Sequence, residues 1–157
     1  HPHTLASRNN LASAYHDADR LNEAIPLYEQ NLTDRTRILG SDHPHTLASR
    51  NNLASAYHDA GRLNEAITLF EQSLKDFENL LGPHHPRTRL SRENLAYAYQ
   101  TAGRLNEAIP LYEQTLNDRT RILGSDHPHT LATRNILAEA YRAAGRIEED
   151  PDQETDD

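Results

Sequence analysis

The sequence of 157 residues contains no cysteine, so disulfides and thiolate chemistry are excluded. We take this as favouring a reducing, cytoplasmic compartment. Tryptophan and methionine are also absent, aromatic residues make up 6% of the chain, and hydrophobic residues make up 36%. That is little for a globule with one central core. It favours a thin structure in which each unit buries one face against its neighbour.

Long apolar segments are absent as well. No apolar run approaches the roughly 20 residues that a membrane-spanning helix needs, and no signal-peptide pattern is present. We therefore expect no membrane partner. Because the chain begins at His1, without methionine and in phase with the repeat described below, we expect it to be a piece of a longer protein.

An excess of basic residues is also lacking. The net charge is −8, but residues 148–157 hold seven acidic and no basic residues. Removing these seven from the 24 acidic residues leaves 17 against 16 Lys and Arg, so residues 1–147 carry only −1. A nucleic-acid-binding protein should show a basic excess, so no nucleic-acid partner is expected. Residues 148–157 are expected to form a disordered acidic tail, because they offer little apolar surface to bury.

The sequence is built from an internal repeat of 42 residues. The dipeptide His-Pro recurs at residues 1, 43, 85 and 127. Residues 1–42 match residues 43–84 at 31 of 42 positions and residues 85–126 at 32 of 42 positions. A fourth, partial copy covers residues 127–147. We expect residues 1–147 to form one array of about 3.5 repeats.

Each copy is predicted to contain two helices joined by a turn. In the first copy, the first helix runs from about Pro2 to Ala18, since proline fits a first helical turn. The second runs from about Asn22 to Leu39. The apolar stripe of the first helix comprises Leu11, Ala12, Tyr15 and Ala18. The pattern predicts seven helices, two in each of the first three copies and one in the fourth, and no strand.

All six glycines fall at the ends of these helices, where glycine adopts a left-handed conformation at little cost. Asp19 stands where the later copies have Gly61, Gly103 and Gly145, and it is the poorer residue for that conformation. No glycine is left to form a phosphate-binding loop.

The residues of each copy fit the tetratricopeptide pattern W-x2-L-G-x2-Y…A-x3-F. In the second copy the pattern positions are Arg50, Leu53, Ala54, Tyr57, Ala66 and Phe70. Arginine replaces the large apolar residue at the head of the pattern, and the period is longer than the usual ~34 residues. This variant, with L-G-x-D-H-P, resembles the kinesin light chain repeat and the arrays of bacterial NB-ARC-type signalling proteins. The resemblance implies an all-α, right-handed α-solenoid of helix-turn-helix repeats whose first helices line a concave, peptide-binding groove.

The resemblance also implies which residues face that groove. They are Asn9, Asn10, Ser13, His16, Asn51, Asn52, Ser55, His58, Asn94, Tyr97 and Asn135. Asparagine can donate and accept hydrogen bonds together, which matches the N–H and C=O groups of an extended peptide. The alternative is that the second asparagine row, Asn10, Asn52 and Asn94, only links adjacent helices.

Histidine and arginine also recur with the repeat. His-Pro-His occurs at three of the four repeat starts, but zinc needs three or four converging ligands, so helix capping is favoured over a metal site. A row of arginines lies at the edge of the apolar stripe, where a structural ion pair is favoured over ligand contact. The row is Arg8, Arg50, Arg92 and Arg134, and the expected partners are Glu23, Glu29 and their equivalents Glu65, Glu71, Glu107 and Glu113.

No catalytic residues are indicated, because serines and acids recur with the repeat, whereas an active site is a single asymmetric cluster. The sequence favours an interaction module for a protein or peptide ligand, without enzyme activity or a cofactor, within a larger signalling or scaffold protein. The alternative is a scaffold that forms homo-oligomers. The fourth copy has a first helix without a second, so Leu131, Ile136, Leu137 and Tyr141 should lack cover. Of these, Ile136, Leu137 and Tyr141 are expected to mediate self-association.

Overall fold

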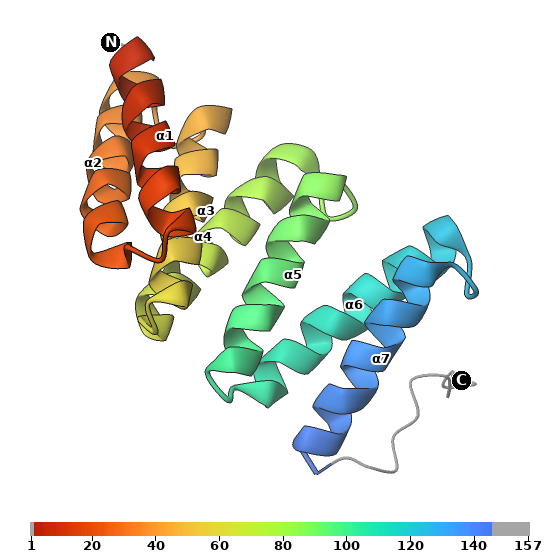
Figure 1. Cartoon of the computed structure of the whole chain (residues 1–157). Helices are drawn as coiled ribbons and strands as arrows, with labels where there is room; N and C mark the ends of the chain where they lie inside the picture. The colour runs from red at the N-terminus through yellow and green to blue at the C-terminus, as the bar shows by residue number, and fades with distance from the viewer. Residues whose placement is uncertain (1, 146–157) are drawn as a thin grey trace. The chain divides into compact units, whose positions relative to one another are not determined.

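The computed structural model describes residues 2–145, with side chains from residue 4, and its regular structure within that range is entirely α-helical. The helices are α1 (Pro2–Asp17), α2 (Leu21–Leu39), α3 (Pro44–Asp59), α4 (Leu63–Leu81), α5 (Pro86–Thr101), α6 (Leu105–Leu123) and α7 (Pro128–Ala143) (Figure 1). The prediction of seven helices and no strand is confirmed for the described residues. None of these helices is long and apolar enough to cross a membrane. The predicted acidic tail lies outside the described residues.

The chain divides into two compact units, His1–Asp76 and Phe77–Asp157. In the first unit, α2 packs against both α1 and α3. In the second unit, α6 packs in the same way against both α5 and α7. A second helix therefore contacts the first helix of its own repeat and the first helix of the next repeat, which is how stacked helix pairs bury a continuous core.

The His-Pro dipeptides begin the first helices. In His43, His85 and His127 the backbone is extended, and Nδ1 accepts a hydrogen bond of 3.1 Å from the N–H two residues further on. The bond satisfies one of the N–H groups that have no partner at a helix start. The proline that follows has no N–H to satisfy. The capping role predicted for His-Pro is confirmed at these three helices.

The turn after each first helix requires a left-handed residue. Gly61 has φ +77°, and the N–H of Arg62 then bonds the carbonyl of Tyr57 at 2.8 Å. Asp19 has φ +58° in the same position of the first copy, and it is the one non-glycine residue with positive φ in the described range. The predicted need for positive φ is confirmed, and an aspartate there bears the steric strain that glycine avoids.

Leu11 does not belong to the core, contrary to the prediction. It is 48% exposed, whereas Leu53 in the same position of α3 is 4% exposed. Helix α3 packs on α2, the second helix of the preceding repeat, whereas no second helix precedes α1 among the described residues. Burial at this position therefore depends on the preceding repeat.

The last helix shows the opposite pattern. Leu137 and Tyr141 are buried, which corrects the expectation that they lack cover, because α6 packs on this side of α7. Leu131 and Ile136 are 41% and 39% exposed. Leu131 corresponds to the buried Leu47, and within the described residues no second helix follows α7 to cover it.

Three members of the arginine row, Arg8, Arg50 and Arg92, are paired with carboxylates, but not with the predicted glutamates. Nη1 of Arg8 lies 2.6 Å from Asp34, and Nη1 of Arg50 lies 2.6 Å from Asp76. In the third repeat, Nη1 of Arg92 lies 3.1 Å from Asp118. The partner in each pair lies 26 residues on, in the second helix of the same repeat. The ion-pair interpretation was right and the partners were wrong, because the glutamates are used elsewhere. The partners are Asp34, Asp76 and Asp118.

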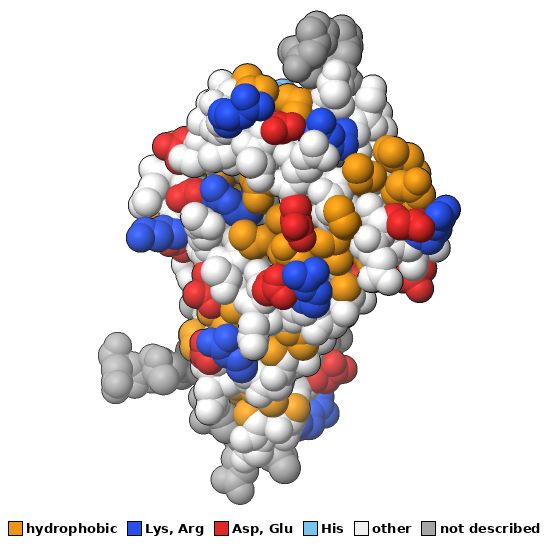
Figure 2. Space-filling model, turned by 90° about the vertical axis from the view of Figure 1, so that its left-hand side faces the viewer, with side chains coloured by type: hydrophobic (Ala, Val, Ile, Leu, Met, Phe, Trp, Pro, Cys, Tyr) orange, Lys and Arg blue, Asp and Glu red, His pale blue; other side chains and the backbone are white. Residues whose placement is uncertain are grey.

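Surface charges are paired locally as well. The turn arginines Arg20, Arg62 and Arg104 each bond the glutamate three residues on. Figure 2 shows hydrophobic side chains on one face of the molecule lying among such neighbouring blue and red groups. Exposed pairs of this kind contribute little to stability, because water screens the attraction between the two charges.

Candidate functional site

In the first unit, α1 and α3 carry eight of the predicted ligand-contacting residues. Asn10 is exposed. The other seven, Asn9, Ser13, His16, Asn51, Asn52, Ser55 and His58, are half-buried. They recur at the same positions of two helices whose sequences are identical.

A hydrogen bond between two asparagines joins these two helices. Nδ2 of Asn52 donates to Oδ1 of Asn9 at 3.3 Å. This is the helix-linking role that the alternative interpretation gives to the second asparagine row. Asn10 has no preceding repeat to contact among the described residues, and its exposed amide remains open to a ligand. Ligand contact by either residue stays a prediction.

His16 and His58, which occupy the same repeat position on α1 and α3, both contact a carboxylate that the sequence analysis did not single out. Nε2 of His16 lies 2.6 Å from Oδ2 of Asp59, and Nδ1 of His58 lies 3.4 Å from Oδ1 of the same residue. Nδ1 of His16 also lies 3.4 Å from the hydroxyl of Tyr28. Burial raises the pKa of Tyr28, and a hydrogen bond with Ser13 offsets part of that rise. His16 is therefore held in place by neighbours on α2 and α3.

In the second unit, α5 breaks the repeat pattern. Tyr97 stands where the first two copies have serine, and it is 59% exposed. Leu90, one helical repeat of seven residues earlier on the same face, is 57% exposed and stands where the other copies have alanine. Asn94 lies between them and is half-buried. This face of α5 thus combines two apolar side chains with an amide.

The polar residues beside this face already have partners on α6. Glu93 pairs with Arg119 of α6 at 2.6 Å. Gln100 replaces the histidine of the first two copies and accepts a bond from the Tyr112 hydroxyl at 2.7 Å. Burial raises the pKa of Tyr112 to about 12, so its hydroxyl is protonated at neutral pH. On α7, Asn135 is exposed beside Ile136.

Leu90 was missed by the sequence analysis, which took inner-face residues only from the family pattern. Comparing the copies with one another would have found it, since alanine occupies that position in three copies of four. An apolar hollow of about 460 Å³ was also missed. It lies at the end of α2, where Ile38 and Leu39 meet Leu5 of α1, and no repeat motif predicts it.

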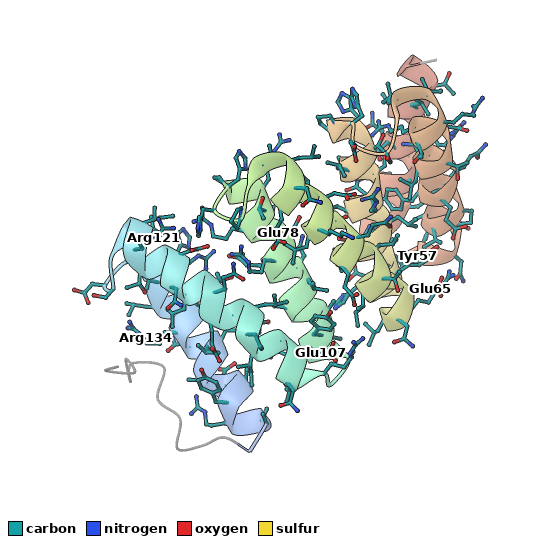
Figure 3. The ribbon with its side chains drawn as sticks, turned by 180° about the vertical axis from the view of Figure 1, so that it is seen from behind. Tyr57, Glu65, Glu78, Glu107, Arg121 and Arg134 are labelled. Atoms are coloured by element: carbon teal, nitrogen blue, oxygen red, sulfur yellow. The ribbon has the colours of Figure 1, made fainter. Side chains whose placement is uncertain are left out.

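Helices α2 and α6 are each linked to the first helix that follows them through a tyrosine and a glutamate. The hydroxyl of Tyr57 donates to Glu29 at 2.9 Å, and that of Tyr141 donates to Glu113 at 3.0 Å. Figure 3 shows Tyr57 close to Glu65, whose partner Arg62 stacks on the Tyr57 ring at 4.4 Å. These contacts are structural, and they explain why the glutamates are not free to pair with the arginine row.

Groups that could hold a metal ion do not occur in the part of the chain that the structure describes. The stacked rings of His43 and His45, with centroids 5.2 Å apart, belong to a helix cap in which His43 already accepts a backbone bond. What the described surfaces offer a ligand is hydrogen-bonding amides and exposed apolar side chains.

Comparisons with known proteins agree with this geometry. The sequence matches the tetratricopeptide repeat family over residues 3–79, 52–120 and 88–149. No curated protein matches the sequence. A crystal structure from Podosopora anserina, described as a kinesin light chain with nearly identical TPR-like repeats, has 38% identity and a TM-score of 0.82. The match covers 94% of this chain and 70% of that one, and a single-substitution variant of the same protein gives 37% identity with the same TM-score and coverage.

A more distant structure supports the fold alone. BtubC (BKLC) from P. vanneervenii has 23% identity and a TM-score of 0.80, over 92% of this chain and 57% of that chain. The predicted fold class, an all-α solenoid of helix-turn-helix repeats, is thereby confirmed, as is the resemblance to kinesin light chain repeats.

Proposed function

The chain belongs to the tetratricopeptide repeat family, and on that premise we propose that it binds a peptide or protein segment through the first helices of its repeats. Repeats of this family mediate protein–protein interaction. The module would serve a larger signalling or scaffold protein. Nothing in the described residues resembles a constellation of nucleophile, base and oxyanion donors, so interaction is the function that the geometry supports best.

The observation that best supports this proposal is the accessible face of α5, where Leu90, Asn94 and Tyr97 lie in one row. Two of the three are large apolar side chains more than half exposed, and such positions on a helix are normally polar. An exposed aromatic is a favoured anchor in protein interfaces because it buries a large area with few rotatable bonds. The amide between the two can bond the backbone of a ligand.

The chemistry of the ligand follows from these residues. It should present an apolar side chain to Leu90 and Tyr97 and backbone groups to Asn94. On α1, Asn10 offers a second accessible amide in the first unit. Because Glu93 is already paired and residues 1–147 are nearly neutral, binding should depend only weakly on salt concentration.

Peptide selection tests the proposal. We would select binders from a random display library of short peptides against the full chain and measure their dissociation constants by isothermal titration calorimetry. Tyr97→Ala should weaken the selected peptides by about 2 kcal/mol, as for an interface anchor. Asn94→Ala should weaken them by about 1–2 kcal/mol, the loss of one hydrogen bond to a buried partner.

Gln72→Ala is the matched control, because Gln72 is an exposed amide on a second helix, α4, and not on a first helix. It should leave the dissociation constants unchanged. Selected peptides that bind Tyr97→Ala and Asn94→Ala as tightly as the unmodified chain would overturn the proposal, as would peptides that lose affinity only with Gln72→Ala.

Self-association is the second candidate function, and the exposed apolar pair on α7 favours it. Leu131 and Ile136 are exposed, whereas Leu137 and Tyr141, which were also predicted to mediate self-association, are buried. Sedimentation velocity over a range of concentrations should show an oligomer that Ile136→Glu dissociates. A monomer at every concentration would exclude this candidate and leave the ligand-binding proposal intact.

A further inference from the structure

The apolar hollow of about 460 Å³ lies at one end of the first unit, close to the start of α1, the end of α2 and the start of α3 (Figure 1). Leu5 and Ala6 of α1 form one part of its wall, and Ile38 and Leu39 of α2 form another. Ile38 and Leu39 are 52% and 38% exposed. Sites for small molecules have volumes of about 300–1,000 Å³ and mostly apolar walls with a few polar groups. The hollow has the size and the walls of such a site.

Arg35 of α2 also lines the hollow, and its positive charge has no counter-charge. Nη1 of Arg35 donates to the carbonyl of His45 at 3.0 Å and to Oγ of Ser49 at 2.9 Å, and both acceptors are neutral. Within residues 4–145, no carboxylate pairs with Arg35, and its Nε and Nη2 have no hydrogen-bond partner. Burial lowers the pKa of Arg35, because part of the charge is removed from water without compensation.

The second unit shows how the same charge is neutralised when a carboxylate is present. Arg119 of α6 occupies the repeat position of Arg35, and its Nη1 likewise donates to a carbonyl and a hydroxyl of the following helix. Nη2 of Arg119 lies 2.6 Å from Oε1 of Glu93 on α5. In the first copy Asn9 stands at the position of Glu93, so Arg35 lacks this partner. A ligand that supplies the missing negative charge is therefore favoured at Arg35.

The unused edge of the Arg35 guanidinium has the geometry that binds a carboxylate. Nε–H and Nη2–H of an arginine form a fork that matches the two carboxylate oxygens. Arg62 shows this fork in use, since its Nε and Nη2 donate to the two oxygens of Glu65 at 2.9 and 2.6 Å. His43 also lines the hollow. Its Nδ1 accepts the N–H of His45, so the neutral ring carries its proton on Nε2, which is a second donor.

We propose that this hollow is a binding site for a small amphipathic carboxylate, a molecule whose carboxylate pairs with Arg35 and whose short aliphatic chain packs between α1 and α2. The apolar walls select against an anion without a hydrocarbon body, and the unpaired guanidinium selects against a neutral hydrocarbon. All the residues that line the hollow lie in the first unit, whereas the peptide-binding proposal rests on Leu90, Asn94 and Tyr97 of α5. The two proposals are therefore independent.

Octanoate, an eight-carbon carboxylate, is the probe. We would titrate it into the isotope-labelled full chain and follow the backbone amides by nuclear magnetic resonance. Saturable shifts are expected at Leu5, Ala6, Ile38 and Leu39. Octanamide has the same chain without the charge, and acetate has the charge without the chain. Each should bind at least about tenfold more weakly than octanoate, because each lacks one of the two contacts.

Three variants of the full chain test the assigned contacts. Arg35→Gln should weaken octanoate binding by about tenfold or more, because it removes the charged donor. Ala6→Leu should weaken it by filling part of the hollow, and Leu90 at the same repeat position of α5 shows that the helix accepts leucine there. Asn9→Glu should also weaken it, because it places beside Arg35 the carboxylate that the second unit has at this position. Circular dichroism checks that each variant keeps its helical content.

Two other arginines provide matched controls. Arg37 lies on the same helix as Arg35 but is exposed and pairs with Asp34. Arg119 has the same repeat position as Arg35 but is neutralised by Glu93. Arg37→Gln and Arg119→Gln should both leave the dissociation constant of octanoate unchanged.

Four results would overturn the proposal. The first is the absence of saturable shifts, and the second is shifts that lie away from the hollow. The third is octanamide binding as tightly as octanoate, which would leave Arg35 without a role. The fourth is an equal loss of affinity in Arg35→Gln and Arg37→Gln, which would indicate unspecific attraction of the anion by positive charge. Each of these results leaves the peptide test at Tyr97 and Asn94 unaffected.

Discussion

The hydroxyl of Tyr57 on α3 donates to Oε1 of Glu29 on α2 at 2.9 Å, and this bond joins the second helix of one repeat to the first helix of the next. Tyr57 is almost fully buried, and Arg62 stacks on its ring at 4.4 Å. The tyrosine therefore contributes both apolar burial and a hydrogen bond to a charged acceptor, and the two contributions can be separated by substitution.

Tyr57→Phe should lower the free energy of unfolding by about 1–2 kcal/mol, because it removes one hydrogen bond to a carboxylate. Tyr57→Ala should cost roughly 3–5 kcal/mol, because it also leaves a cavity. Urea unfolding followed by circular dichroism measures both. Tyr15→Phe is the matched control, since Tyr15 occupies the same position on α1, and no second helix precedes α1 among the described residues. A loss at Tyr15 equal to that at Tyr57 would contradict the assigned role of the bond to Glu29.

Alkaline pH should weaken the same contact. Burial, together with the hydrogen bond to Glu29, raises the pKa of Tyr57 from 10.0 to about 12. A raised pKa means that the folded state holds its proton more tightly than the unfolded state does, so stability falls as the pH rises through this range. We expect the free energy of unfolding to decrease between about pH 10 and pH 12.

The variant Tyr57→Phe should show a shallower decrease over that range, because it has lost one of the titrating groups. Tyr112, whose pKa burial also raises to about 12, should account for part of the remaining slope. Urea unfolding at a series of pH values gives the slopes. Equal slopes for the unmodified chain and for Tyr57→Phe would show that this tyrosine does not contribute.

Asp19→Gly should stabilise the chain. Asp19 holds a left-handed φ of +58°, a conformation that costs a residue with a Cβ roughly 1–2 kcal/mol. Glycine avoids that cost but loses entropy on folding, so the net gain should be about 1 kcal/mol. Gly61→Asp is the converse substitution at φ +77° and should destabilise by a similar amount. Thermal unfolding measures both, and a lower melting temperature for Asp19→Gly would contradict the argument.

The helices could be predicted closely because each boundary has a local cause. His-Pro starts the first helices and a left-handed residue ends them, so the repeat alone fixes their positions. The partners of the arginine row could not be predicted in the same way. Glu29 and Asp34 lie on the same second helix, and only the packing of that helix shows that Asp34 faces Arg8 while Glu29 faces the next repeat.

Burial at the two ends of the array shows a second limit of sequence reasoning. Leu11 is exposed and Leu137, at the same repeat position, is buried, because cover there comes from the preceding repeat. Leu5 is buried and Leu131 is exposed, because cover there comes from the second helix of the same repeat. A sequence shows one apolar stripe, whereas the helix buries two faces against two different neighbours. For this reason the sequence wrongly predicted that Leu11 would be buried and that Leu137 would be exposed.

The ion pairs of the arginine row differ in burial, and this difference gives a graded prediction. Arg92 is fully buried and Asp118 nearly so, whereas the Arg8 and Asp34 side chains are 18% and 23% exposed. Nη2 of Arg92 also donates to the carbonyl of Pro83 at 2.7 Å. Removing the carboxylate from the buried pair leaves an uncompensated charge in the core, while removing it from the exposed pair leaves one that water can reach.

Asp118→Ala should therefore cost roughly 3–5 kcal/mol, the usual effect of breaking a buried pair. Asp34→Ala should cost much less than Asp118→Ala, because solvent screens the remaining arginine. Replacing both partners together, as Arg92→Met with Asp118→Leu, should recover most of the loss, since apolar side chains of similar size need no counter-charge. Urea unfolding of the three variants gives the comparison. Equal costs for Asp118→Ala and Asp34→Ala would show that burial does not set the strength of this repeated pair.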